Sequence, residues 1–418
     1  MKKGLNIEIY PNRQQQKIIE MSFGAIRFVH NKILSIKKEL WEDYRLSFNP
    51  NLKSFKEEWK WLNKIPSQAL ANCYMDSIKS FDNFFKCLNG KSKAQQKYPR
   101  FKKKGKSKDS FRIAATKTSK GYDLRIENRN HIKIPKLGIV QFANYTDLDW
   151  SKIHIYNITV SKSHCGRYYA SLCVEVSEPE YKEPKYYTTS FDLGIKDFAI
   201  FDDGTVENNP KYFRKSEKKL IKEQRLLSKM VKGSNNYNEK KLKIARIHEK
   251  IKNQRKDFQH KLSTRIVNEN QVIISEDLNV KGMLKNHKLA KSIQDASFGT
   301  FCNMVKYKAV QNHRIYLKID RFFPSSKLCH HCGFKYKGLN LEERFWICPH
   351  CGMYLDRDEN AAINILNEGL RILKEKYPDG TRESGAFTPK PIDTGYIGNL
   401  ESELLIKDLN RRSCPLGQ

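Results

Sequence analysis

The sequence lacks the long apolar runs that would place a protein in or across a membrane. No window approaches the ~18 consecutive apolar residues of a membrane-spanning helix. The first residues, MKKGLNIEIYPNRQQQ, contain no apolar stretch long enough for a secretory signal. A lipid-anchor motif is also missing. We therefore expect a soluble, intracellular protein with no membrane partner.

Negative charge is scarce relative to positive charge. The 418 residues include 78 Lys and Arg against 46 Asp and Glu, which gives a formal net charge of +32. Such an excess predicts a polyanionic partner, with nucleic acid as the default. An anionic membrane surface is the weaker alternative, because the basic residues are spread along the whole chain. The length allows two to four domains at ~100–200 residues each.

Cysteines are few, and only four of the ten follow a pattern. The other six are interpreted as free thiols in a reducing compartment: Cys73, Cys87, Cys165, Cys173, Cys302 and Cys414. The patterned four form two Cys-x-x-Cys pairs separated by fifteen residues, a spacing typical of structural zinc sites. They are Cys329, Cys332, Cys348 and Cys351.

Each Cys-x-x-Cys knuckle places two thiolates on one tight turn, and Gly333 and Gly352 suit the backbone of such turns. Four thiolates make a closed tetrahedral zinc site with no open catalytic position. Two disulfides or a redox-active pair are the alternatives, and both fit an intracellular, basic chain poorly. His330, His331 and His350 are then expected at the surface or against nucleic acid instead of on the metal.

Hydrophobic periodicity separates a helical segment from a β-rich one. A strand is predicted over residues 4–10, helices from residue 14 to about 88, and short strands from 111 to 176. Residues 177–187 form a Pro/Glu-rich linker, so a boundary falls near residue 185. The chain shows no fixed-period repeat.

Beyond the linker, strand and helix patterns alternate. The predicted elements are a hairpin over 188–208, a long charged helical segment over 215–268, a strand over 271–280, a helix over 297–312, a strand over 314–323 and a last helix from about 357 to 374. We expect most of the tail from residue 378 to be mobile.

Acidic residues stand at three places where they are costly to bury. Asp192 lies within an apolar strand pattern, Glu276 ends another, and Asp356 and Asp358 open the last helix. For any single one, a salt-bridged or edge-strand acid is the alternative. As a set they can converge at one edge of a sheet, where carboxylates suit Mg²⁺ or Mn²⁺. Spacing alone does not decide between Asp356 and Asp358.

Several segments together resemble one known family. They are YPNRQQQKIIE, RFVHNKIL, YPRFKKKGK, FDLGIKDFAIFDDG, HEKIKNQRKDFQHKLS, IISEDLNV, FPSSKLCHHCG and RFWICPHCGMYLDRDENAAINI. The chain resembles the TnpB family of transposon-encoded, RNA-guided DNA endonucleases, which are akin to compact type V CRISPR effectors. The resemblance covers nearly the whole chain to about residue 370.

The resemblance implies an RNase H-like (RuvC) nuclease with a split active site. By motif match, Asp192 is the first-strand acid, Glu276 the second, and Asp358 the helix acid of a D-x-N-A motif. These three would be the Mg²⁺ ligands of a two-metal hydrolysis of DNA phosphodiesters, with Mn²⁺ as a substitute. The structural Zn²⁺ module would then be an insert between the last strand and the last helix.

The implied architecture is a multidomain α+β fold. Its expected parts are a first strand of a β-barrel-like wedge domain (1–13), a helical recognition domain with a basic loop (14–108), the rest of the wedge domain (109–184), the first part of the nuclease (185–325), the zinc insert (326–353), the last nuclease helix (354–377) and a flexible tail (378–418).

A basic run beside aromatic residues is the candidate nucleic-acid contact. It lies next to Tyr98 and includes Phe101, and such mixtures bind phosphates and stack bases. Its cations are Arg100, Lys102, Lys103, Lys104 and Lys106. The alternative is a solvated, mobile loop. In the zinc insert, Lys335 and Arg344 are expected near the cleft, and Trp346 is interpreted as a core residue of the insert before a base-stacking one.

The resemblance also implies the partners. These are a guide RNA encoded by the transposon end and a target DNA carrying a short flanking motif. We expect a monomeric ribonucleoprotein in the cytoplasm of a prokaryote, associated with the nucleoid. The alternatives are a non-cleaving RNA-guided repressor, a general zinc-containing nucleic-acid-binding protein and a strand-joining transposase. The intact acid set disfavours the first, and no His-hydrophobe-His and Tyr arrangement supports the last.

Overall fold

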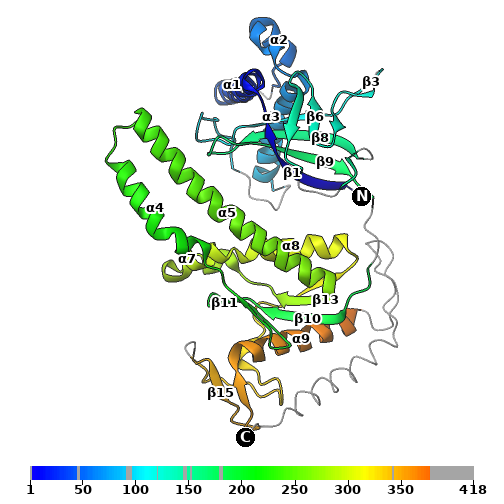
Figure 1. The fold of residues 1–418 in the computed structure, drawn as a ribbon, viewed down its shortest axis with the longest axis vertical. Helices are drawn as coiled ribbons and strands as arrows, with labels where there is room; N and C mark the ends of the chain where they lie inside the picture. The colour runs from blue at the N-terminus through cyan, green and yellow to red at the C-terminus, as the bar shows by residue number, and fades with distance from the viewer. Residues whose placement is uncertain are drawn as a thin grey trace. The chain divides into compact units, whose positions relative to one another are not determined.

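The computed structural model describes residues 2–44, 48–90, 97–119, 121–144, 148–150, 153–177, 182–340 and 343–376. The chain divides into two compact units, Met1–Glu178 and Pro179–Gln418, so the division comes slightly before the expected boundary near residue 185 (Figure 1). The tail expected to be mobile lies outside the described residues. None of the described helices is both long and apolar enough to cross a membrane.

The first unit combines helices and strands in the order that the periodicity predicts. Its strand β1 spans Lys2–Tyr10 and is followed by the 32-residue helix α1, Arg13–Tyr44. The other helices are α2 (Leu52–Glu58), η1 (Lys60–Lys64) and α3 (Ser67–Leu88). The strands are β2 (Ser110–Ala114), β3 (Lys117–Thr118), β4 (Gly121–Tyr122), β5 (Arg125–Asn128), β6 (His131–Ile134), β7 (Gly138–Phe142), β8 (His154–Lys162) and β9 (Tyr168–Glu175).

Seven of these strands form one sheet, in the order β2-β8-β9-β1-β7-β6-β5. The chain's first strand therefore lies inside the sheet, paired antiparallel to β9 and β7. The expected barrel is not closed among the described residues, because β2 and β5 remain the two ends of the sheet. Helices cover the apolar face instead: Phe23 and Ile33 of α1 and Leu70 of α3 share one core with Ile113 and Val160 of the strands.

The second unit contains a five-stranded sheet and a small cysteine-containing module. Its elements are β10 (Tyr186–Asp192), β11 (Asp197–Phe201), β12 (Val206–Asn208), α4 (Tyr212–Ser228), α5 (Asn235–Glu269), β13 (Asn270–Glu276), α6 (Val280–Met283), α7 (His287–Ala296), α8 (Phe298–Gln311), β14 (Ile315–Ile319), η3 (Ser325–Lys327), β15 (Phe345–Ile347), β16 (Tyr354–Asp356) and α9 (Arg357–Lys376).

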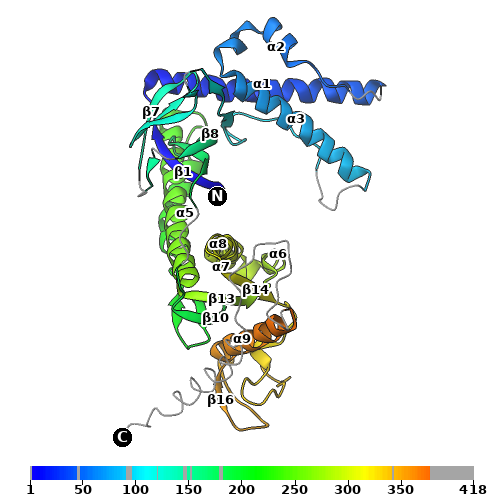
Figure 2. The same ribbon diagram turned by 90° about the vertical axis from the view of Figure 1, so that its right-hand side faces the viewer.

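The five-stranded sheet is covered on both faces. Its order is β12-β11-β10-β13-β14, with β10, β13 and β14 parallel and β11 and β12 antiparallel. Helices α5 and α8 lie on one face and α9 on the other (Figures 1 and 2). Along β13, Ile273 packs with the α5/α8 side, while Val272 and Ile274 pack with α9. This two-sided burial explains why β13 reads as a continuous apolar run.

Helix α9 lies unusually close to the sheet at Gly369. A Cβ atom at this position would lie 2.5–3.0 Å from the side chain of Ile274 on β13. Only a residue without a Cβ fits there without a shift of the helix or the strand.

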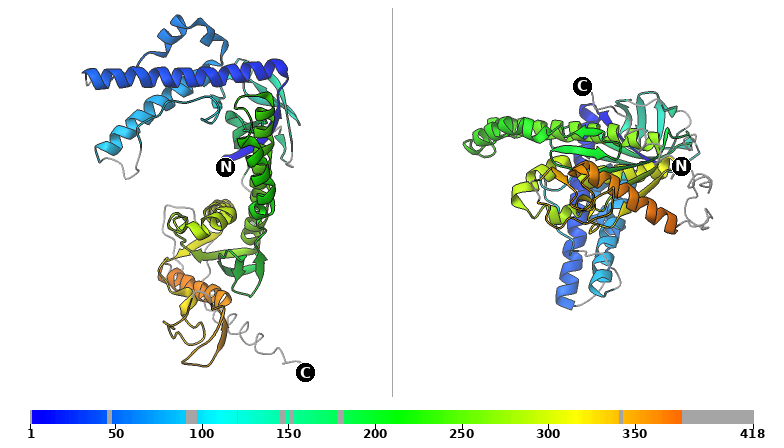
Figure 3. Two further views of the ribbon diagram at one scale, coloured as in Figure 1. Left: turned by 90° about the vertical axis from the view of Figure 1, so that its left-hand side faces the viewer. Right: turned by 90° about the horizontal axis from the view of Figure 1, so that it is seen from below.

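Two parts of the second unit differ from the sequence prediction. The segment predicted as one long helical stretch is two helices, α4 and α5, which lie side by side as a hairpin (Figure 3). The break comes where Gly233 adopts a φ of 89° and Ser234 caps α5 through the backbone N–H of Tyr237. Helices α6 and α7 were not predicted.

Candidate metal centre and carboxylate site

Two of the predicted acids lie at the same edge of the five-stranded sheet. Asp192 is the last residue of β10 and Glu276 is the last residue of β13. The two strands are parallel neighbours, with Phe191 opposite Ser275. The carboxyl ends of parallel strands form the edge at which open α/β sheets place their sites.

The start of α9 distinguishes the two aspartates that spacing left open. Asp356 precedes the helix, and its Oδ1 accepts hydrogen bonds from the backbone N–H groups of Asp358 (2.8 Å) and Glu359 (3.0 Å). Asp356 is therefore the helix cap. Asp358 lies within the first turn, and its negative charge reaches Asp192. This geometry favours Asp358 as the third acid.

Electrostatics show that the three acids share one region. Burial, followed by the negative charges of Glu276 and Asp358, raises the pKa of Asp192 to about 7. A hydrogen bond from the Leu193 backbone and the charge of Arg357 oppose this rise. Burial also raises the pKa of Glu276. Repulsion of this kind is what a bound divalent cation relieves.

Glu276 and Asp358 also contact residues next to and within the cysteine module. Glu276 accepts a hydrogen bond of 2.5 Å from the hydroxyl of Ser325. Asp358 forms an ion pair with Arg344, so that arginine lies at the site as expected. Neither partner blocks the whole carboxylate, since each contact uses one oxygen.

The four patterned cysteines form a metal-ligating cluster. Their sulfurs all lie within 4.8 Å of one another, with 3.7 Å between Cys329 and Cys351 and 3.6 Å between Cys332 and Cys348. Four sulfurs about 2.3 Å from one zinc ion would lie about 3.8 Å apart, whereas disulfide sulfurs lie about 2.05 Å apart. The spacing fits a shared metal ion and excludes disulfides.

Within the described residues, these cysteines are the one group of three or more His, Cys, Asp or Glu side chains with ligand atoms so close together. The three acids do not meet this limit, so at least one pair of carboxylates is farther apart than 4.8 Å. The acids therefore lie as neighbours around a common region without touching as a cluster.

The two knuckles have the same backbone geometry. In each, the backbone N–H of the first cysteine donates to the carbonyl oxygen of the residue five positions later. The glycine N–H donates to the carbonyl oxygen of that same cysteine at 2.9 Å. Gly333 and Gly352 adopt φ values of 74° and 71°. These left-handed conformations confirm the reason given for glycine at both positions.

The interior of the module is aromatic. Trp346 is buried and stacks on Tyr336, with ring centroids 5.5 Å apart, which confirms its interpretation as a core residue. His331 and His350 are exposed, as expected. His330 is only partly exposed. Its backbone N–H and its ring contact Asn360 of α9, so it joins the module to that helix.

Sequence reasoning missed two asparagines and one serine that connect these parts. Asn360 and Asn364 are almost fully buried on α9 and donate to backbone carbonyls beside the module. Two amides four residues apart within NAAINIL were the available signal, because a polar side chain on an apolar helix face needs a partner. Ser325 carried no comparable signal.

The basic run in the first unit is held against α1. The carbonyl of Arg100 lies 3.2 Å from the His30 ring, and the backbone of Lys102 makes two hydrogen bonds with the Asn31 side chain. The described run is therefore not a freely solvated loop. Four of its five cations are exposed: Arg100, Lys103, Lys104 and Lys106.

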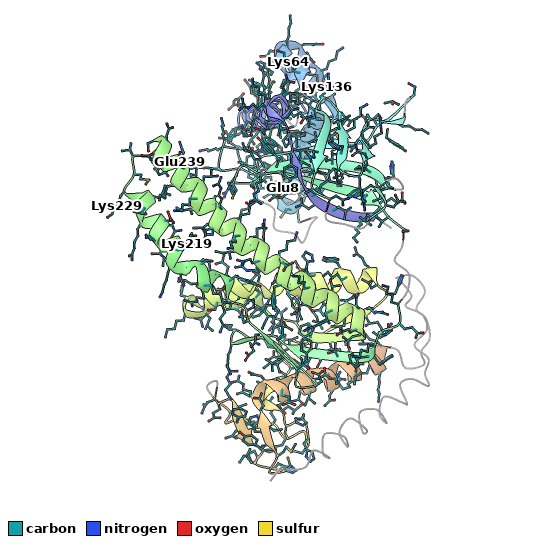
Figure 4. The ribbon with its side chains drawn as sticks, in the orientation of Figure 1. Glu8, Lys64, Lys136, Lys219, Lys229 and Glu239 are labelled. Atoms are coloured by element: carbon teal, nitrogen blue, oxygen red, sulfur yellow. The ribbon has the colours of Figure 1, made fainter. Side chains whose placement is uncertain are left out.

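Lysines also lie along the α4–α5 hairpin. Figure 4 shows Lys219 on α4, Lys229 at its end and Glu239 near the start of α5. Between the two helices, the buried carboxylate of Glu223 pairs with Lys240 at 2.9 Å and Lys243 at 2.7 Å. Hydrogen bonds from Lys243 and Lys240 lower the pKa of Glu223 to about 2.

Three family models match the chain. An OrfB model of the IS605 type, described as "Probable transposase", matches residues 171–287. A model described as "Cas12f1-like, TNB domain" matches residues 298–365, and an OrfB "Helix-turn-helix domain" matches residues 1–54. Fold, site and models together define the class: an OrfB protein of the IS605 type with a Cas12f1-like module.

Relatives and solved structures cover most of the chain. A protein of Streptomyces pristinaespiralis named "Putative RNA-guided DNA endonuclease" is 35% identical, over 88% of this chain and 90% of its own. The similarly named InsQ of Escherichia coli (strain K12) is 31% identical, over 89% and 93%. This chain belongs to the TnpB family. A solved Cas12f1–sgRNA–target DNA complex contains a chain of similar fold, with a TM-score of 0.55 at 13% identity, covering 87% of this chain and 98% of that one.

Proposed function

We propose that this protein is the RNA-guided DNA endonuclease of a transposon, and that it hydrolyses DNA phosphodiesters at the carboxylate site with Mg²⁺. Its partners are a guide RNA encoded at the transposon end and a target DNA with a short flanking motif. The names of the two relatives support the activity. The formal charge of +32 supports partners made of nucleic acid.

The observation that carries the proposal is that Asp192 and Glu276 end neighbouring parallel strands near Asp358 at the start of α9, with the pKa of Asp192 raised by burial and then by the charges of the other two acids. An RNase H-like fold is supported by the strand order, in which three parallel strands continue into an antiparallel pair. In such a sheet the acids would be brought together from β10, β13 and α9. We assign these three residues as the Mg²⁺ ligands.

The carboxylates are suited to hold hard divalent cations, which when bound would activate a water molecule and stabilise the leaving oxygen. The protein's own part is positioning and charge. Asp192 carries a proton for part of the time at neutral pH, because its pKa is about 7, so cation binding there releases a proton. Arg344 and Arg357 bring positive charge to the same edge, where a phosphate backbone would lie.

The cysteine cluster is proposed to hold one structural Zn²⁺. All four donors are thiolate-forming cysteines, and their spacing leaves no open position for a substrate. Metal analysis of the purified protein should find about one zinc per chain. Cys348→Ser should lose that zinc, whereas Cys173→Ser, which changes a cysteine of the first unit, should keep it.

The test of the function uses protein expressed with its native flanking DNA. RNA that co-purifies is sequenced, and the complex is then incubated with Mg²⁺ and a plasmid library carrying randomised flanks. One enriched RNA is expected, with cutting beside a single flanking motif. The Asp192→Ala complex should bind the same DNA without cutting it.

Two other outcomes would replace the proposal. One enriched RNA with DNA binding but no cutting by the unmodified protein would identify an RNA-guided repressor. If no defined RNA co-purifies and no metal-dependent cutting occurs, the protein is a general nucleic-acid-binding protein with a zinc module. Normal cutting by Asp192→Ala would remove Asp192 from the site.

A further inference from the structure

The stem of the cysteine module, residues 325–328, connects the region after β14 to the first cysteine of the cluster. The stem begins with the short helix η3, and its last residue directly precedes Cys329. It passes the sheet edge where Glu276 ends β13. The stem therefore joins the cluster to the residue that contacts Glu276.

Ser325 is the residue of the stem that contacts an acid. Its side chain is buried, and its hydroxyl donates to Oε1 of Glu276 at 2.5 Å. A hydrogen bond to a charged carboxylate is stronger than one between neutral groups, and it restricts the rotation of the carboxylate. The bond occupies one oxygen, so Oε2 of Glu276 remains available for a cation.

The stem itself is held by helix α9. The side-chain amide of Asn364 donates to the carbonyl oxygens of Ser325 (2.8 Å) and Leu328 (2.6 Å). Asn360 donates to Leu328 at 2.8 Å and accepts from the backbone N–H of His330 at 3.0 Å. Both asparagines are about 98–99% buried. Because buried amide hydrogen bonds are expensive to break, this clamp fixes where the hydroxyl of Ser325 points.

The neighbouring Ser326 provides a contrast. It has the same side chain one position later, yet within the described part of the chain it makes no side-chain hydrogen bond. The structure therefore separates a serine directed at an acid from one that only occupies the stem. A difference between the two in metal binding cannot come from serine content or helix propensity.

We propose that Ser325 is a positioning residue, which fixes the carboxylate of Glu276 for divalent-metal binding and couples that site to the cysteine module through the clamped stem. This inference rests on the proposed function, since it assumes that Glu276 is a divalent-metal ligand. Residues that orient metal ligands in this way typically change metal affinity by about 10–100-fold when they are removed.

The experiment measures Mn²⁺ binding to the full-length protein by calorimetry, independently of cutting. Ser325→Ala should bind Mn²⁺ about tenfold more weakly than the unmodified protein. Ser325→Thr keeps the hydroxyl and should bind Mn²⁺ about as tightly as the unmodified protein. Ser326→Ala should also have the Mn²⁺ affinity of the unmodified protein. In cutting assays, Ser325→Ala should need about tenfold more Mg²⁺ and regain most of its rate at saturating Mg²⁺.

Zinc content and thermal unfolding show whether Ser325→Ala is folded. If it loses zinc or unfolds early, Ser325→Cys, a weaker donor of similar size, decides the question, with binding between that of alanine and serine expected. Mn²⁺ binding by Ser325→Ala or Ser325→Cys equal to that of the unmodified protein would overturn the inference. Asp192→Ala separates the two proposals: if it also binds Mn²⁺ normally, the acids are not the metal site and the proposed function fails first.

Discussion

At the scale of single residues, the carboxylate site is unfavourable for the stability of the fold. Asp192 carries a raised pKa because its carboxylate is buried and because ionising it adds a negative charge near Glu276 and Asp358. Natural sites often keep such strain because it serves binding, and its removal then stabilises the protein. The sequence singled out Asp192 and Glu276 because carboxylates in or at the end of apolar strands are unusual, whereas Asp358 was chosen over Asp356 by the family motif. The strength of their interaction depends on tertiary distances that no sequence pattern contains.

Asp192→Asn should therefore stabilise the protein when divalent cations are chelated. The folded-state pKa of about 7 lies above the ordinary 3.8, so the unmodified protein loses stability from this group as pH rises from about 4 to 7. At pH 8 the variant should be more stable by ~1–2 kcal/mol, or a few degrees in Tm, after allowance for partial solvent exposure. Thermal unfolding in EDTA and in Mg²⁺ checks this. An equal gain in both conditions would contradict the explanation, because bound cations should cancel it.

Replacement of Asp356 and of Asp358 by asparagine should affect DNA cutting differently. Asn caps helices about as well as Asp, so Asp356→Asn should keep both the fold and near-normal cutting. Asp358→Asn should lose cutting by at least ~100-fold while its Tm changes little, because its ion pair with Arg344 is partly exposed. Cutting rates and Tm of the two variants are the measurement. A loss of cutting in Asp356→Asn with normal Tm would exchange the two assignments.

At the scale of elements, periodicity predicted most helices and strands, and local chemistry explains the exceptions. The break between α4 and α5 depends on Gly233 and Ser234 within a polar, highly charged stretch, where an apolar stripe continues on both sides. Helices α6 and α7 are short, and each is capped by an asparagine, Asn279 and Asn286. Asparagine is equally common in loops, so these caps were not distinctive before the fold was known.

The α4–α5 hairpin should depend on pH through Glu223. Its pKa of about 2 lies below the ordinary 4.5, so its contribution to stability is complete above about pH 4.5 and is lost as pH falls towards 2. Glu223→Gln should increase hydrogen exchange in α4 at pH 7, and the difference from the unmodified protein should shrink as pH falls from about 4.5 towards 2. The exposed Glu239, on the same hairpin, is the matched control. Equal exchange in both variants at pH 7 would show that the ion pairs do not hold the hairpin.

At the scale of the whole molecule, the net charge predicts a partner but does not locate it. Lysines are distributed over the helices α4 and α5 and over the basic run, a non-helical segment whose backbone is held by His30 and Asn31. A fixed backbone presents charges at set positions, which lowers the entropy lost on binding a phosphate chain. The sequence identified the run by composition, whereas its attachment to α1 required contacts about 70 positions apart along the chain.

Neutralising three exposed lysines of the run should weaken RNA binding in a salt-dependent manner. For Lys103→Ala, Lys104→Ala and Lys106→Ala combined, the slope of log affinity against log salt concentration should fall by about 2, at ~0.7 per phosphate contact on a single strand. Titrations of the co-purified RNA from low to high salt measure the slope. Lys64→Ala, on η1, reports the effect of removing one exposed charge elsewhere. An unchanged slope in the triple variant would place the RNA contact outside the run.

Gly369 sets the angle at which helix α9 packs on the sheet, and the helix would pivot about this point if the contact changed. It is the point where the helix approaches β13 too closely for a Cβ atom, and it lies eleven residues from Asp358, or about 16 Å along the helix axis. A methyl group added there would push on Ile274, and a small tilt at the pivot would become a larger displacement of the carboxylate at the far end. The carboxylate site thus depends on a packing contact outside it. Gly369→Ala, a conservative substitution in the hydrophobic core, would displace Asp358 and misalign the site.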